Sequence, residues 1–316
     1  MTSTGDELQR ARQQADELRA TGLEQLRSSL ETRALVGPMI DDVVGLAREA
    51  MEALDDGRPL NPALEAALDE AIRALRPFVL VGRAGLAPLP PLAAARFPNW
   101  AACAAAVRPA LGAIGKVSLP GPEGERVDVA TGFLVAPRLV ATNRHVLEVL
   151  EAGTGALVAG QATVAFGQQY EGAEPAAVAI VAVAAQHPSL DVVVLEIGPG
   201  AGGTPLALPA IDVALVPGDE LATIGFPARP GDGGVLDALL SGPYAGKKRG
   251  SPGRVRTMGV DQIDHDCSTA PGSSGSPVFR QRDGTLVGIH YEGVVGIRNG
   301  ALPVAAVREL VDGLGG

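Results

Sequence analysis

Three residue types in this 316-residue chain could together turn a hydroxyl group into a nucleophile: serine, histidine and aspartate. The serine stands in TAPGSSGSPVF, residues 269–279, a small polar stretch that turns abruptly apolar. Serine attacks a carbonyl carbon well only when a base takes its proton, and histidine is the usual base because its pKa lies near neutrality. A carboxylate then fixes the imidazole tautomer and stabilises the imidazolium. The chemistry to look for is therefore acyl transfer.

The pattern Gly-x-Ser-Gly-Ser-Pro indicates which serine would react. A glycine shortly before the nucleophile lets the chain fold back so that two backbone N–H groups converge on the developing oxyanion. This selects Ser274, and we expect the N–H groups of Gly272 and Ser274 to form the oxyanion hole. Ser276 leads into the next strand.

The partners of the serine are expected at the ends of two apolar strands. His145 closes the run ATGFLVAPRLVATNRHVL, and Asp191 opens the strand in HPSLDVVVLEI. We take His145 as the base and Asp191 as the residue that orients it. His187, before a proline, is interpreted as a loop histidine, and His265 as a structural or hydrogen-bonding residue.

Other reactive or charged residues are given ordinary roles. Asp264 and Asp266 are interpreted as loop charges, and GKKRG at 246–250 as an exposed loop. Cys103 and Cys267 form neither a disulfide scaffold nor a metal-site spacing, so we expect buried small residues. The reaction requires no metal and no organic cofactor.

The elements that must position these residues are short strands. From about residue 113, β-branched runs alternate with Gly/Pro turns, a pattern typical of an antiparallel β-barrel or sandwich rather than of βαβ units. A helix is expected at PVAAVRELVDGL, at the end of the chain.

The first 77 residues instead show helical spacing of apolar residues and predict three helices with short connections. Residues 78–109 are interpreted as a proline-rich linker that lies against the next domain, with one short helix after Trp100. The helical region is either a packing extension or an adaptor that binds a regulatory protein partner.

Composition narrows the class of protein. A net charge of −10 argues against a nucleic-acid partner. The polar N-terminus lacks the apolar core of a secretory signal, and no apolar run approaches the length of a membrane span. We therefore expect an intracellular, cytoplasmic protein without a membrane partner.

Six segments resemble the trypsin-like serine proteases, specifically the bacterial glutamyl-endopeptidase-like branch: TGFLVAPRLVATNRHV, LDVVVLEI, IGFP, DCSTAPGSSGSPVF, VGIH and NGALPV. The order His, Asp, Ser is also that of chymotrypsin-type enzymes. The resemblance covers about residues 110–316. It implies an all-β fold of two six-stranded antiparallel β-barrels, preceded here by the helical region, with His145 and Asp191 on the first barrel and Ser274 on the second. It also implies a protein or peptide substrate.

Two positions depart from the secreted members of that family. Ser273 replaces the aspartate that pairs with a newly freed N-terminus in zymogens, so we expect no activation of that kind. Val146 replaces a disulfide-bonded cysteine, in agreement with a reducing compartment.

The same resemblance places the wall that receives the substrate side chain before the scissile bond (P1) at Ser268, Thr269 and His290. A hydroxyl and an imidazole could hydrogen-bond a carboxylate, which favours an acidic P1 residue. The sequence therefore predicts an intracellular serine endopeptidase. Two alternatives stay open: a peptidase gated by its N-terminal helices, and a non-catalytic protease-like binding module.

Overall fold

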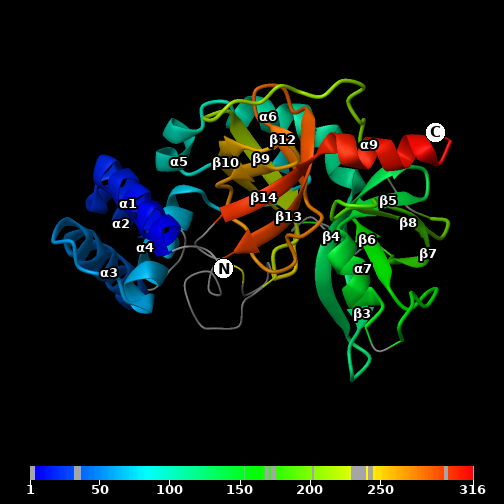
Figure 1. Ribbon diagram of the computed structural model, residues 1–316, viewed down its shortest axis with the longest axis horizontal. Coiled ribbons are helices and arrows are strands. Elements are labelled where there is room, and N and C mark those ends of the chain that lie inside the picture. The colour runs from blue at the N-terminus through cyan, green and yellow to red at the C-terminus, as the bar shows by residue number, and fades with distance from the viewer. Residues whose placement is uncertain are drawn as a thin grey trace.

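The computed structural model describes residues 4–31, 37–152, 154–167, 171, 176–200, 203–228, 240, 245–294 and 298–315. Figure 1 shows three bodies in a row along the long axis: a helical body, a central barrel and an outer barrel. None of the helices within the described residues is long and apolar enough to cross a membrane.

The helical body holds one helix more than the sequence predicts. Its helices are α1 (Thr4–Thr21), α2 (Leu23–Glu31), α3 (Gly37–Asp55) and α4 (Pro62–Leu75). The first expected helix is divided at Gly22, whose φ of 85° is left-handed and therefore ends α1. At α4 the start follows the expected chemistry, because the Asn61 side chain accepts the N–H of Leu64 at 3.0 Å. Buried leucines and alanines form a core separate from that of the barrels.

The outer body is the first barrel in the chain. Its strands are β3 (Ile114–Pro120), β4 (Arg126–Ala136), β5 (Leu139–Thr142), β6 (Thr163–Phe166), β7 (Val178–Gln186) and β8 (Val193–Ile197). They close in the order β3-β4-β5-β8-β7-β6, and each neighbouring pair is antiparallel. A short helix, α7 (Arg144–Leu150), directly follows β5.

The central body is the second barrel. Its strands are β9 (Glu220–Gly225), β10 (Arg249–Met258), β11 (Ile263–His265), β12 (Pro277–Arg280), β13 (Leu286–Val294) and β14 (Arg298–Pro303). The pairing of β10 with β11 closes the ring β9-β10-β11-β14-β13-β12. The expected fold of two six-stranded antiparallel barrels is therefore confirmed. The C-terminal helix α9 (Val304–Gly313) returns to pack on β7 and β8 of the first barrel.

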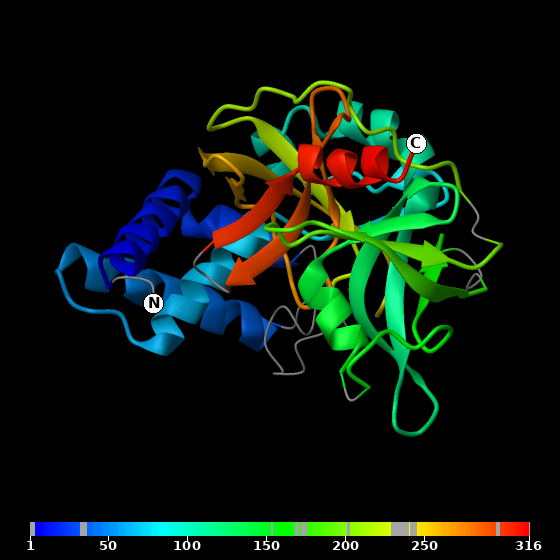
Figure 2. The same ribbon diagram turned by 45° about the vertical axis from the view of Figure 1, so that its right-hand side comes forward.

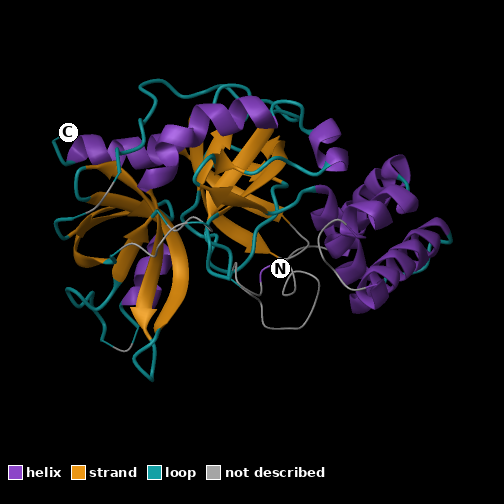
Figure 3. Cartoon of the chain, turned by 180° about the vertical axis from the view of Figure 1, so that it is seen from behind, coloured by secondary structure: helices purple, strands orange, loops and turns teal. Residues whose placement is uncertain are grey.

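The segment expected to be a linker contributes to the second barrel. It contains β1 (Val79–Gly82), β2 (Gly85–Leu86), α5 (Pro91–Arg96), α6 (Trp100–Val107) and the 3-10 helix η1 (Arg108–Ala113). Strand β1 pairs with β10, so the hairpin β1–β2 extends the sheet of the barrel. The helix α6 is the short helix expected after the linker. Seen from behind in Figure 3, helices line one side of the two barrels and the helical body lies at the far end.

The basic stretch GKKRG is not the exposed loop that the sequence predicts. Lys248 is fully buried and Arg249 is nearly so, at the start of β10. The Lys248 ammonium donates to the carbonyl of Leu111 and lies 5.5 Å from the ring centroid of Phe226. Burial lowers the pKa of Lys248 to about 7. The glycines around this stretch mark the entry to a strand rather than a loop.

Candidate active site

His145 and Asp191 are brought together by two neighbouring strands of the first barrel. His145 lies in α7 just after β5, Asp191 lies in the turn just before β8, and Thr142 at the end of β5 pairs with Val193. Asp191 Oδ2 is 2.6 Å from His145 Nδ1, and Asp191 Oδ1 accepts the backbone N–H of His145 at 2.9 Å. Because a carboxylate accepts hydrogen bonds, this contact places the imidazole proton on Nδ1 and leaves Nε2 as an acceptor.

A buried asparagine holds the backbone next to the His145–Asp191 pair. Asn143 is fully buried between β5 and α7, and its Nδ2 donates to the carbonyl of Asp191 at 2.9 Å. This contact fixes the backbone of the aspartate, whereas the histidine engages its carboxylate. Asn143 is not among the residues predicted from the sequence, although a polar residue between an apolar strand and a histidine is a usable signal.

Ser274 lies in a turn, residues 271–275, that precedes β12 of the second barrel and is called the serine turn below. Gly272 and Gly275 have φ values of 85° and 83°, in the left-handed region. A Cβ atom at Gly275 would lie 1.9 Å from the carbonyl oxygen of Thr131, and one at Gly272 would lie 2.6 Å from that of Phe226. Glycine is therefore required on both sides of Ser274, as the pattern predicts.

Thr131 of β4 connects this turn to the first barrel. Its N–H donates to the carbonyl of Ser274 at 2.8 Å, and its hydroxyl donates to the carbonyl of Gly272 at 2.9 Å. The same hydroxyl accepts the N–H of Phe226 at 3.0 Å. Its carbonyl accepts the hydroxyl of Thr142, which comes shortly before His145. The serine turn and the segment before His145 are thus joined through one buried threonine. Thr131 is not among the residues predicted from the sequence.

On its other side the serine turn pairs with β13. The N–H of Gly275 donates to the carbonyl of His290, and the N–H of His290 donates to that of Ser276, both at 2.8 Å. Ser273 lies beneath the turn, where its hydroxyl accepts the N–H of Ala270 at 3.1 Å. The turn that contains Ser274 is consequently held by backbone hydrogen bonds to both barrels.

The family model of the trypsin-like peptidase domain matches residues 130–289, which is about half of the chain. The match begins next to Thr131 and includes His145, Asp191 and Ser274. The chain belongs to the trypsin-like peptidase family. No curated protein sequence matches this chain.

The chain is also similar to solved structures. One of them is the serine endoprotease from Yersinia pestis, with 20% sequence identity and a TM-score of 0.48. The similarity covers 66% of this chain and 65% of that one. The chain therefore spans slightly less than two thirds of the length of that protein.

Thr269 precedes the serine turn and belongs to a small group of polar side chains. Its hydroxyl donates to Asn299 Oδ1 at 2.6 Å, and Asn299 Nδ2 donates to the carbonyl of Cys267 at 2.7 Å. A Cβ atom at Gly293 would lie 2.9 Å from the Thr269 hydroxyl. Thr269, Gly293 and Asn299 are therefore adjacent, and the last two were not identified from sequence.

His290 lies in the same part of the second barrel and faces His265. The Nδ1 atom of His290 is 3.3 Å from Nε2 of His265, and the N–H of Cys267 donates to Nδ1 of His265 at 3.3 Å. The proton of His265 is therefore on Nε2, which donates to His290. Burial lowers the pKa of His265 to about 4 and that of His290 well below 6.5. Both rings are neutral at neutral pH, and the expected hydrogen-bonding role of His265 is confirmed.

Ser268, which is expected in the substrate wall, forms hydrogen bonds to two other parts of the chain. Its hydroxyl donates to the carbonyl of Arg76 at 2.7 Å, at the end of α4, and its N–H donates to Ser251 Oγ at 2.9 Å. The side chain thus contacts the helical body, because the chain turns there between β11 and the serine turn. The Ser268 hydroxyl therefore links the segment before the serine turn to the end of α4.

Asp266 is not the loop charge that the sequence predicts, whereas Asp264 contacts only nearby polar side chains. Asp266 Oδ2 is 3.0 Å from Arg76 Nη2 and 2.7 Å from Arg256 Nε, and its Oδ1 accepts the N–H of Arg254 at 2.6 Å. Burial raises the pKa of this carboxyl, but the two guanidinium groups outweigh burial and lower it overall.

The remaining reactive side chains lie outside this arrangement. Cys103 and Cys267 are buried free thiols, as expected, and burial raises the pKa of Cys103 to about 12. His187 is a loop histidine whose Nδ1 accepts the N–H groups of Ser189 and Leu190. Among the described residues, no group of three His, Cys, Asp or Glu side chains could hold a metal ion.

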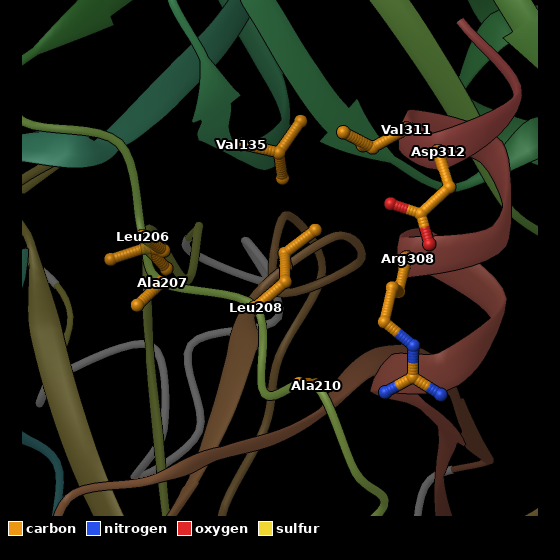
Figure 4. A pocket seen from close by; sticks show the side chains of 8 residues that line it. All are labelled: Val135, Leu206, Ala207, Leu208, Ala210, Arg308, Val311 and Asp312. Atoms are coloured by element: carbon orange, nitrogen blue, oxygen red, sulfur yellow. The ribbon is translucent and has the colours of Figure 1, made fainter. Parts of the chain in front are cut away.

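A cavity of about 510 Å³ lies where the segment 206–210 passes α9 (Figure 4). Its lining consists of Val135, Leu206, Ala207, Leu208, Ala210, Arg308, Val311 and Asp312. Arg308 is engaged there by the carbonyl of Pro209 and the carboxylate of Asp212. The cavity contains none of the predicted catalytic or substrate-binding residues.

Proposed function

We propose that this chain is a serine endopeptidase in which His145, Asp191 and Ser274 form the catalytic triad. The observation that carries the proposal is the 2.6 Å contact between His145 Nδ1 and Asp191, next to a glycine turn that Thr131 ties to the same barrel. Membership of the trypsin-like peptidase family supports peptide hydrolysis as the activity.

The proposed reaction has two steps. Ser274 Oγ attacks the scissile carbonyl carbon while His145 Nε2 takes the hydroxyl proton, and the N–H groups of Gly272 and Ser274 stabilise the oxyanion. The imidazolium then gives its proton to the leaving amine as the C–N bond breaks, which leaves an acyl-enzyme. In the second step His145 deprotonates a water molecule that hydrolyses the ester and releases Ser274. No metal or organic cofactor takes part.

Substitution of the serine tests this assignment. Ser274→Ala should lower kcat on a cleaved peptide by more than about a thousandfold and abolish labelling by a fluorophosphonate. Ser276→Ala is the matched control, since it removes a hydroxyl of the same turn and should retain both. Labelling that survives in Ser274→Ala would show that another residue is the nucleophile. A wild-type chain that neither cleaves nor labels would instead favour a non-catalytic binding module.

We also propose an acidic P1 preference, as in the glutamyl-endopeptidase-like branch. The support is three hydrogen-bonding side chains of the second barrel: Thr269 and Asn299, which bond each other, and the neutral His290 ring, which faces His265. A basic P1 residue would instead need a carboxylate in the wall, and neither Thr269 nor His290 supplies one.

Cleavage of a peptide library, analysed by mass spectrometry against the Ser274→Ala variant, tests this preference. Cuts should concentrate after Glu or Asp, and Thr269→Val should weaken the bias because it keeps the shape of the side chain and loses the hydroxyl. Equal cleavage after Leu, Lys and Glu would rule out the acidic pocket.

A gated peptidase is the second candidate. The observation that favours it is the contact of the helical body with residues 266–268, close to the serine turn. A gated enzyme should cleave casein slowly in full-length form even though it labels with a fluorophosphonate. Rapid casein cleavage by the isolated full-length chain would argue for an ungated enzyme.

A further inference from the structure

The segment 266–269 joins β11 to the serine turn and lies outside the strand ladders of the second barrel. Its position therefore depends on side-chain contacts more than on sheet pairing. Asn299 holds the carbonyl of Cys267 and the hydroxyl of Thr269 from within the barrel. The segment also contacts β10, through Ser251, Arg254 and Arg256, and the helical body, through Arg76.

One residue of the helical body contacts this segment at two points. Arg76 caps the C-terminal end of α4. Its guanidinium group lies 3.0 Å from Asp266, and its backbone carbonyl accepts the Ser268 hydroxyl at 2.7 Å. The two contacts flank the buried Cys267 and stand directly before Thr269.

Arg76 is itself fixed by the helical body. Its side chain is only 4% exposed, and its Nη2 is 2.6 Å from Glu17 of α1. Glu17 also pairs with Arg96 of α5 and, at 3.4 Å, with Arg256 of β10. Because Arg76 is buried and these charges share partners, the loss of its guanidinium group leaves Glu17 and Asp266 with less compensation.

The arrangement of the bodies agrees with this chain of contacts. Figures 1 and 2 both place the helical body against the second barrel and away from the first. The histidine and aspartate belong to the first barrel, so the helical body reaches the expected substrate wall and not the acid–base pair.

We propose that Arg76 is a positioning residue for the substrate pocket, which it holds in place through Asp266 and Ser268. The inference rests on the proposed peptidase function and assigns the helical body a part in it: α1 and α4 fix Arg76, and Arg76 fixes the approach to Thr269. The pocket of this peptidase is thus completed by a part of the chain outside the two barrels.

The experiment separates substrate binding from the reactivity of Ser274. Full-length wild-type and variant chains are compared in kcat and KM on a cleaved peptide and in labelling by a small fluorophosphonate that lacks a P1 side chain. Arg76→Met should raise KM about tenfold while the labelling rate stays within about threefold, the pattern expected when binding rather than chemistry is damaged. Ser268→Ala, which removes one hydroxyl and no charge, should raise KM about threefold by the same reasoning.

The matched control is Arg27→Gln. It removes an exposed ion pair with Asp41 inside the helical body and should leave KM, kcat and labelling unchanged. Circular dichroism establishes that each variant is folded. Should Arg76→Met fail to fold, Ser268→Ala decides the question.

Three results distinguish the claims. Raised KM with preserved labelling in the folded variants supports the positioning role. Unchanged KM in folded Arg76→Met and Ser268→Ala, with a wild-type chain that labels and cleaves, overturns it and leaves the proposed function intact. A wild-type chain that does not label shows that the proposed function has failed, and this inference falls with it.

Discussion

At the scale of single residues, the centre of the molecule is organised by buried polar side chains that carry no catalytic chemistry. Thr131 is fully buried and satisfies groups of Gly272, Phe226 and Ser274. Buried polar groups must find partners, because an unpaired one costs about 1–3 kcal/mol. A threonine in an apolar strand can thus join two barrels at low cost, provided that all its bonds are made.

His265 makes stability depend on pH. Its pKa is about 4 in the folded chain because burial disfavours the charged ring, against an ordinary value of 6.5. The unfolded chain therefore binds a proton below pH 6.5, while the folded chain does not until about pH 4. The stabilisation is complete above pH 6.5 and is lost as the pH falls toward 4, by about 3 kcal/mol in total.

Urea unfolding at pH 7, 5.5 and 4.5 measures this effect. As the pH is lowered, the free energy of unfolding should decrease in the wild type. It should decrease less steeply in His265→Gln, which keeps a hydrogen-bonding side chain and does not titrate. His290 faces His265 and titrates in the same direction, so part of the dependence should remain in the variant. Identical slopes in the two proteins would contradict the assignment.

At the scale of elements, the turn before β8 is built on His187. The ring is nearly buried, and its Nδ1 accepts the N–H of Ser189 at 3.3 Å and of Leu190 at 2.9 Å. Its Nε2 lies 3.5 Å from Glu309 of α9. A histidine acceptor here fixes the chain immediately before Asp191.

His187→Ala should therefore lower kcat about tenfold with little change in KM, because a displaced carboxylate orients His145 less well. His187→Asn is the control: asparagine can accept the same N–H groups, as in an Asx turn, and should retain most of kcat. The measurement is steady-state kinetics at a pH where both variants are folded. A tenfold loss of kcat in His187→Asn as well would show that the turn contacts are not what matters.

The sequence predicted those elements whose local pattern and tertiary environment agree. Short β-branched runs correctly indicated antiparallel strands from about residue 113, and the glycine turn was recognised from the Gly-x-Ser-Gly pattern. Strand β10 was missed because Gly250, Pro252 and Gly253 read as a turn. Pro252 pairs with Ala222 of β9, but on the other side of β10 it lies between the stretches that pair with β1 and with β11, where no ladder partner needs its N–H.

The residues of the candidate site also differ in whether a local sequence pattern marks them. The residues His145, Asp191 and Ser274 could be proposed from the sequence because their types and flanks form a local pattern. Thr131 and Arg76 were not, because their importance depends on partners more than a hundred residues away. Periodicity and motif spacing contain no information about such contacts.

At the scale of the whole molecule, the chain links its parts out of sequence order. The N-terminal helical body and the hairpin β1–β2 both attach to the second barrel, although the first barrel comes between them in the sequence. The C-terminal helix α9 leaves the second barrel and packs on the first. The segment 78–99 is therefore tied into the sheet at β1 and is part of the peptidase structure.

This arrangement bears on activation. Ser273 is uncharged and its hydroxyl already accepts the N–H of Ala270, so it offers no carboxylate to a newly freed amine. A cut in the segment between β2 and α5 should not activate the enzyme. The cut would break the covalent link between the helical body with β1 and the rest of the chain. We therefore expect kcat/KM to stay constant or to fall.

A chain with a specific cleavage site inserted at 87–90 tests this expectation. Fluorophosphonate labelling and kcat/KM are measured before and after cutting, and the uncut insertion variant serves as the control. Labelling before the cut at the wild-type rate would show that the oxyanion hole forms without a new N-terminus. Labelling that begins only after the cut would mean that a freed amine completes the site, with some group other than Ser273 as its partner.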